Sequence, residues 1–148
     1  MKLPKLDEIG YWSELKLEIV KKYATAYSII MNRQSFIKAY YYIDGFAGAG
    51  VHRSKSTKEL IPGSPANALS VQPPFTGYHF IDLDGDKADL LKELSKDNPK
   101  VSIYEGDGNQ ILLEKVFPLI DYNSIILPSG PGLIIIVSPI LSDLFSFS

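Results

Sequence analysis

Acidic residues and glycines gather at three points of the chain, each directly after a run of apolar or aromatic residues. The first is the segment Asp44–Gly50, which reads Asp-Gly-Phe-Ala-Gly-Ala-Gly. The second begins at Asp82 and reads Asp-Leu-Asp-Gly-Asp, and the third is Glu105–Gly108. Small residues after a strand let the backbone approach a ligand closely, and a carboxylate there can accept the two hydroxyls of a ribose. Together the three segments are typical of a nucleoside-binding site.

Each segment also has a purely structural interpretation. Gly-x-Gly loops occur in many tight turns, and Asp82 can end a strand in a turn where Asp84 or Asp86 caps the next helix. Asp107 either contacts an adenine amino group or caps the helix that follows it, and taken alone the cap is favoured. The spacing supports the combined site. The two acidic segments follow the glycine loop by about 35 and about 60 residues, as successive βα units would place them.

The elements that must position these residues are predicted from local patterns. Strands are expected at 39–43, 77–83, 101–104 and 124–127, because these runs are apolar, aromatic or β-branched. Helices are expected at 11–31, 86–96 and 108–119, and a short helix begins with Ser64 as N-cap and Pro65 at its first position. The stretch 52–60 is predicted to be a polar loop. Strands that alternate with helices predict an α/β fold with a mostly parallel, Rossmann-like sheet and flanking helices.

The first helix is predicted to bury one apolar face. Ser13 is a candidate N-cap. Apolar residues recur at spacings of three and four, which predicts a single core-facing side made of Leu15, Ile19, Tyr23, Ala26 and Ile30. Trp12 and Tyr23 are expected to pack in the core, with stacking on a base as the alternative.

Composition limits the function classes. The 148 residues carry a net charge of −2, which excludes a polybasic protein that binds nucleic acid or membranes through its overall charge. Binding of nucleic acid would therefore need a local basic patch. Cysteine is absent and only two histidines occur, so no disulfide, thiolate zinc site or His-rich metal centre is expected. The N-terminus lacks a continuous apolar segment, so the cytoplasm is the expected location.

The last part of the chain differs in composition from the rest. Residues 123–148 contain one charged residue, Asp143, together with three prolines and the run Leu133–Val137. This run predicts a buried strand rather than a membrane span, because prolines and glycines interrupt the uncharged segment around it. We therefore divide the chain into a domain at 1–122 and an atypical apolar tail at 123–148, which holds strands four and five or a frameshifted end.

The three segments resemble motifs I, II and III of class I S-adenosylmethionine-dependent methyltransferases. More narrowly, the chain resembles the three-Cys-motif partner (TcmP) family. The stretches that carry this resemblance are Trp12–Leu17 with Tyr23 and Tyr27, Tyr42–Gly48, and Gly63-Ser64-Pro65 with Ala68 and Leu69. A dinucleotide site for hydride transfer is the near competitor. It is disfavoured because Arg53 stands where a third glycine would be and because a polar insertion follows the loop.

The resemblance implies S-adenosylmethionine as the cofactor, and it implies methyl transfer with no catalytic residue assigned. The implied cofactor-binding residues are Asp44, Phe46, Ala47, Gly48, Gly50, Asp82 and Asp107. Within this set Asp44, Gly48 and Gly50 shape the methionine side, Asp82 takes the ribose hydroxyls and Asp107 takes the adenine amino group. The alternative is a non-catalytic module that recognises a phage-type three-Cys-motif protein through its N-terminal helix.

One departure from the family follows the fourth predicted strand. At this place members of the family carry a segment similar to Leu-Asp-Pro-Tyr-Gly, whereas this chain has Leu127-Pro128-Ser129-Gly130-Pro131. The acid and the aromatic residue that would meet the substrate are both missing, and charged residues become rare from the same place onward. The sequence therefore predicts incomplete C-terminal strands and a truncated or frameshifted product.

Overall fold

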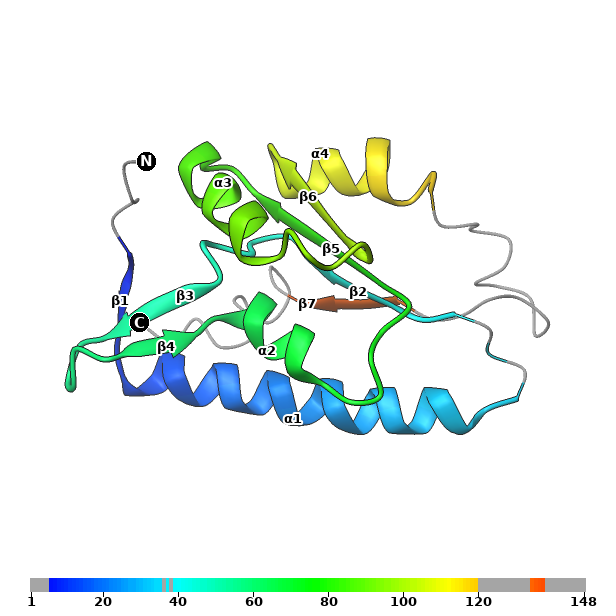
Figure 1. The fold of residues 1–148 in the computed structure, drawn as a ribbon, viewed down its shortest axis with the longest axis horizontal. Coiled ribbons are helices and arrows are strands. Elements are labelled where there is room, and N and C mark those ends of the chain that lie inside the picture. Colours follow the sequence, from blue (N-terminus) through cyan, green and yellow to red (C-terminus); the bar gives the residue numbers. More distant parts are fainter. Residues whose placement is uncertain (1–5, 36, 38, 120–133, 138–148) are drawn as a thin grey trace.

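The computed structural model describes residues 6–35, 37, 39–119 and 134–137, and they form two sheets with helices around them (Figure 1). The larger sheet has the strand order β6-β5-β2-β7, and every neighbouring pair is parallel. Its strands are β2 (Tyr41–Asp44), β5 (Gly77–Asp82), β6 (Val101–Glu105) and β7 (Ile134–Val137). The predicted α/β class and parallel sheet are confirmed, including a strand within the apolar run of the tail. The strand predicted at 124–127 and the segment after it lie outside the described residues.

A smaller sheet has the order β1-β3-β4, in which β1 is parallel to β3 and β3 is antiparallel to β4. Its strands are β1 (Glu8–Ile9), β3 (Val51–Ser54) and β4 (Leu60–Pro62). The predicted polar loop at 52–60 is therefore wrong, because most of β3 and the start of β4 lie inside it. β3 is held by its hairpin partner β4 and by β1, which lies more than 40 residues away in the sequence. Because the strand depends on these pairings, its own sequence shows no alternation of apolar and polar residues that would predict it.

Helices line both faces of the parallel sheet. They are α1 (Tyr11–Arg33), α2 (Ser64–Ser70), α3 (Gly85–Leu94) and α4 (Gly108–Ile111), and α4 continues as a π-helical segment, Leu112–Val116. Figure 1 shows α1 running the length of the molecule with α2 lying between it and the sheet. Within the described residues, none of the helices combines the length and the apolarity needed to span a membrane.

Two apolar clusters form the core, one from each set of alternating side chains of β2 and β5. The first is rich in aromatic rings and joins α1, α2 and α3 to Tyr42, Tyr78 and Phe80. The second joins α4 and the π-helical segment to Ile43 and Ile81. Because side chains alternate along a strand, the two clusters lie on opposite faces of the sheet.

The buried face of α1 is not the predicted one. Ala24 and Ser28 are buried, and Val20, Tyr27 and Met31 pack against the aromatic cluster, whereas most of the predicted face is exposed. The small side chains of Ala24 and Ser28 let the helix lie close to its neighbours. Ser28 Oγ is 3.0 Å from the hydroxyl of Tyr40. Gly10 rather than Ser13 precedes the first turn, so the predicted N-cap is also wrong.

Candidate functional site

The carboxyl ends of β2, β5 and β6 meet at one edge of the parallel sheet. Gly48 N donates to Asp82 Oδ2 at 2.8 Å, which ties the glycine loop after β2 to the end of β5. Gly106 N donates to the main-chain oxygen of Asp82 at 3.0 Å, which ties in the end of β6. A Cβ built on Gly108 would lie 2.9 Å from Gly45 O, so the loops after β2 and β6 also touch. The three predicted segments are thus brought together around Asp82.

Asp44 is fully buried at the end of β2. Its Oδ1 accepts the amide of Phe46 at 3.0 Å, and its Oδ2 accepts the hydroxyl of Ser64. Burial raises the pKa of Asp44 to about 7, the two hydrogen bonds oppose that rise, and the charge of Asp82 adds to it. Both carboxyl oxygens have protein partners, so Asp44 holds the glycine loop and the start of α2 in place.

Ser64 shows a difference between prediction and structure. The sequence predicts Ser64 as the N-cap of the short helix, but Gly63 precedes the helix and Ser64 is its first residue, with Pro65 second. Its hydroxyl therefore does not cap the helix and instead donates to Asp44. Nothing local signals this contact, because Ser64 and Asp44 are 20 residues apart.

Asp82 is only partly buried, and both of its oxygens accept backbone amides. Besides Gly48, the amide of Asp84 donates to Oδ1 at 2.8 Å. Asp84 in turn caps α3 by accepting from the amides of Asp86 and Lys87, so of the two predicted candidates for this cap, Asp84 and Asp86, the structure selects Asp84. A carboxylate has about four lone-pair positions, so two remain on Asp82 for further donors. The arrangement presents an anionic, double acceptor at the edge of the sheet.

The remaining members of the predicted set take different positions. Ala47 is buried in the aromatic cluster, and its amide donates to Ile81 O at 2.9 Å. A Cβ on Gly50 would lie 3.2 Å from carbons of Leu91 and Leu94, so Gly50 packs against α3. Ala47 and Gly50 therefore fix the loop from its interior side.

Asp107 and Phe46 lie at the surface of this edge. Asp107 is exposed and caps α4, with its Oδ1 accepting the amide of Gln110 at 3.0 Å. This is the structural role favoured for Asp107 alone, and the capping bond uses only Oδ1 of its carboxylate. Phe46 is 59% exposed.

Leu83 is a residue that the sequence interpretation passed over. It directly follows Asp82 and is 75% exposed. With Phe46, which lies in the loop after β2, it gives the loops at this edge two exposed apolar side chains. A flat apolar ring is the kind of group that such side chains cover, and the exposure itself is a tertiary property that no local pattern predicts.

His52 in β3 lies close to the glycine loop. Its Cε1 would be 3.8 Å from a Cβ on Gly48 and its Nε2 3.1 Å from a Cβ on Gly63. Burial lowers the pKa of His52, Asp7 opposes that effect, and Lys87 adds to it. Its Nδ1 is buried and has no hydrogen-bond partner. Arg53, the neighbouring candidate for a phosphate contact, instead donates to Lys58 O at 2.8 Å.

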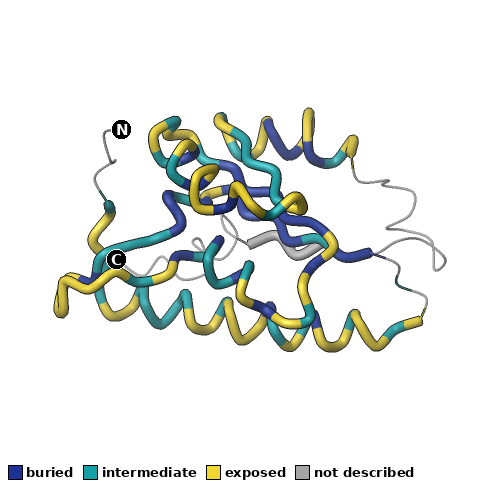
Figure 2. The backbone as a smooth tube through the Cα atoms, viewed as in Figure 1, coloured by how far each residue is buried: buried dark blue, intermediate teal, exposed yellow. Residues whose placement is uncertain are grey.

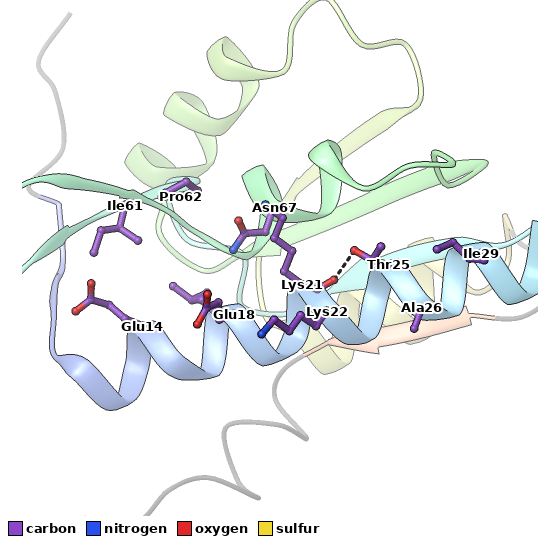
Figure 3. A pocket seen from close by; sticks show the side chains of 11 residues that line it. Glu14, Glu18, Lys21, Lys22, Thr25, Ala26, Ile29, Ile61, Pro62 and Asn67 are labelled. Atoms are coloured by element: carbon purple, nitrogen blue, oxygen red, sulfur yellow. Dashed lines mark hydrogen bonds between the residues drawn. The ribbon is translucent and has the colours of Figure 1, made fainter.

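A cavity of about 600 Å³ lies apart from this edge, between α1, β4 and α2 (Figure 3). Lys21 extends from α1 toward Asn67 of α2, and Glu14 and Glu18 lie on the side of β4. None of the seven predicted cofactor residues lines it. The cavity and the edge around Asp82 are therefore two separate features.

Comparisons with known proteins give evidence on the fold. No family model matches the chain, and no curated protein matches it. Among solved structures it is similar to the crystal structure of protein LPL1258 from Legionella pneumophila, which carries the family description DUF519. The TM-score is 0.57 at 19% identity, over 86% of this chain and 56% of that one. This chain thus spans a little over half the length of the Legionella protein, and the likeness concerns the fold alone.

Proposed function

We propose that this chain binds S-adenosylmethionine at the edge formed by β2, β5 and β6, and that the bound cofactor serves methyl transfer. The observation that carries the proposal is the position of Asp82. Its side chain accepts from Gly48 of the glycine loop, and its main chain accepts from Gly106 beyond β6. A partly exposed acid that connects all three loops is what a ribose-binding carboxylate at a parallel sheet requires.

The residues at this edge fit the nucleoside part of the cofactor. Asp82 keeps a lone pair on each oxygen for the two ribose hydroxyls, and Asp107 keeps one carboxylate oxygen for an amino group. Leu83 and Phe46 offer exposed apolar surface for the adenine ring. Gly48 adds no side chain, and a Cβ there would meet only a ring carbon of His52 within 4 Å, so the loop leaves space beside Asp82.

The order of the strands supports a Rossmann-like sheet of the methyltransferase type. Numbered along the chain, the strands of the sheet β6-β5-β2-β7 run 3-2-1-4, which is the order at the centre of doubly wound folds. The reversal of order falls beside β2, where the glycine loop begins. Ligands of such sheets bind in the crevice outside the carboxyl ends of the strands at this point.

The path of the chain after the loop favours this cofactor over a dinucleotide. In a hydride-transfer site the glycine loop leads straight into a helix whose N-terminus receives the pyrophosphate. Here the loop leads into β3, and α2 begins only at Ser64. A cofactor without phosphate groups has no need of that helix.

The chain contributes binding and orientation. The sulfonium of the bound cofactor supplies an activated methyl group, so the protein has to hold it in line with an acceptor. Asp82 and Asp107 would fix the nucleoside, and Asp44, through Phe46 and Ser64, would keep the glycine loop in shape. The resemblance to the TcmP family supports this assignment.

Calorimetric titration with S-adenosylhomocysteine tests the proposal. Asp82→Ala removes charge-assisted hydrogen bonds worth roughly 1.5–3 kcal/mol, so the affinity should fall ten-fold or more. Asp82→Asn, which keeps one acceptor oxygen for the loop, should bind more weakly than the wild type while melting at a similar temperature. Asp89→Ala removes an exposed carboxylate from α3 and should bind like the wild type. Unchanged affinity in a folded Asp82→Ala protein would remove Asp82 from the site.

A further inference from the structure

The outward side of α1 carries large apolar residues that the fold leaves uncovered. Trp12 is 72% exposed, Ile19 43%, Tyr23 64% and Ile30 52%. Figure 2 shows exposed residues recurring along this helix, whereas the side toward the sheet is partly or fully buried. Ile19, Tyr23 and Ile30 belong to the face that the sequence predicts to be buried, and Trp12 is expected in the core as well. The prediction about their apolarity holds, and among the ring contacts of the described residues Trp12 and Tyr23 meet only rings of the same helix, those of Tyr11 and Tyr27.

With Lys16 and Ala26, which lie between them on the same side of the helix, these four residues follow the spacing of a coiled-coil seam. The steps between the six successive positions are four, three, four, three and four, so the pattern repeats every seven residues. We call this row the α1 stripe, and its members are Trp12, Lys16, Ile19, Tyr23, Ala26 and Ile30. A helix packs such a stripe against a second helix that offers the same period. A flat surface or a strand would not match it.

The α1 stripe is complementary to itself when it runs in the opposite direction. Trp12 and Ile30 are equally far from residue 21, and the same holds for Ile19 and Tyr23. In an antiparallel pair each Trp12 therefore lies opposite Ile30, and each Ile19 opposite Tyr23. Lys16 lies opposite Ala26, the smallest side chain of the stripe, which leaves room for the aliphatic part of the lysine. A parallel pair would instead place Lys16 against Lys16.

Charge on one flank of the stripe also favours the antiparallel arrangement. Glu18 and Lys22 are exposed and one helical turn apart. In the antiparallel register each Glu18 lies within two residues, about 3 Å along the axis, of the position opposite Lys22. The two Lys22 side chains approach each other at the same axial offset, so two pairs of opposite charge stand against one pair of like charge.

We propose that α1 is an interface for a second copy of this chain, formed by antiparallel pairing of the two α1 stripes about residue 21. The pair has two-fold symmetry, so each stripe serves as both halves of the contact. A single pair of helices buries less surface than a large obligate interface, so the dimer depends on protein concentration. The inference does not rest on the proposed cofactor, because no member of the stripe belongs to the predicted site.

Light scattering coupled to size-exclusion chromatography gives the first test. With rising concentration the mass of the full chain should move from 16.4 kDa toward twice that value. Tyr23→Glu places a carboxylate opposite Ile19 and should keep the mass at 16.4 kDa over the same range. Asn32→Glu makes a similar change on an exposed position outside the stripe and should behave like the wild type. A mass of one chain at every concentration would overturn the proposal and leave this face to a different protein, such as the three-Cys-motif partner.

Engineered cysteines test the direction, because the chain has no cysteine of its own. When Ile19→Cys and Tyr23→Cys chains are mixed and oxidised mildly, the antiparallel pair should give mainly the mixed disulfide. A parallel pair would give disulfides between two copies of the same variant, since a disulfide needs Cα atoms less than about 7 Å apart. That result contradicts the proposal. Equal cross-linking of an Asn32→Cys control would show non-specific association and would also contradict it.

Discussion

The neighbouring strands β2 and β5 both end in an aspartate, but their surroundings differ. We call the end of β2 closed, because its carboxylate is buried, and the end of β5 open, because its carboxylate is partly exposed. Each carboxyl oxygen of both residues accepts one hydrogen bond from the protein, but Asp44 at the end of β2 is fully buried. Asp82 at the end of β5 is partly exposed, and the exposed Leu83 follows it. Identical chemistry in the sequence thus gives a scaffold residue in one place and a presented acceptor in the other.

The surroundings of the two ends explain the difference. After β2 the chain approaches another backbone, since Gly45 O would lie 2.9 Å from a Cβ on Gly108. After β5 the close neighbour is a side chain, because a Cβ on Gly85 would lie 2.7 Å from Glu105 Oε1. Backbone against backbone leaves no room to adjust, whereas an exposed glutamate can turn away. The closed end therefore positions the loop, whereas the open end tolerates adjustment of its side chains.

Asp44→Asn should have the largest effect, on the pH dependence of stability. Burial raises the pKa of Asp44 to about 7 in the folded protein, against 3.8 for an ordinary Asp. Because the folded state holds the proton more tightly, the stabilisation is complete below the unfolded pKa and is lost as the pH rises through the folded pKa. The loss amounts to about 4 kcal/mol. Asn does not titrate, so the variant should gain stability relative to the wild type by that order between about pH 4 and pH 8.

Urea unfolding at a series of pH values measures this difference. Asp89→Asn, on the exposed side of α3, is the matched control, and its difference from the wild type should stay much smaller over the same range. If the curves for the wild type and Asp44→Asn run parallel, the end of β2 is not closed in solution and the contrast with β5 fails.

Gly108→Ala and Gly85→Ala compare the two ends by adding the same methyl group. At Gly108 the methyl meets Gly45 O, so the backbone has to shift, and we expect a loss of roughly 1–3 kcal/mol. At Gly85 it meets the end of the Glu105 side chain, so the change should stay within about 0.5 kcal/mol. Equal losses in thermal or urea unfolding would show that both ends are equally rigid.

Gly48 lies in the loop that joins the two ends, and it separates strain from ligand contact. Its φ is +71°, and a Cβ there has space, since its nearest contact is His52 Cε1 at 3.8 Å. Gly48→Val should lose roughly 1–2 kcal/mol of stability, because a β-branched residue is strained in this conformation. Gly48→Asn should keep most of the stability, since asparagine tolerates it.

Under the proposed function both Gly48 variants should bind S-adenosylhomocysteine far more weakly, because either side chain intrudes on the ligand. Calorimetry on the stable Gly48→Asn protein is the decisive measurement. Binding equal to that of the wild type would mean that the loop does not lie against the cofactor and that Gly48 serves only the turn.

Helix α1 shows where local patterns stop being informative. Its position and approximate length follow from the sequence, and the apolar period is real. However, the structure buries Ala24 and Ser28 and leaves Tyr23 outside. Two apolar sides compete on this helix, and the one with small residues allows closer packing against α2 and the sheet. The aromatic side is left for a partner, which periodicity alone does not distinguish from a core.

The sequence by itself determined the parallel α/β architecture, the strands that end in acids and glycines, and a helix cap at either Asp84 or Asp86. These features depend on alternation, β-branching and turn residues, which act over a few neighbouring positions. Only the tertiary structure decided that Asp44 is closed and Asp82 open, that 52–60 contains a hairpin edge, and which side of α1 is covered. The physical reason is that burial depends on segments distant in the chain. Ser64 reaches Asp44 across 20 residues and Gly48 reaches Asp82 across 34, and no local pattern records either contact.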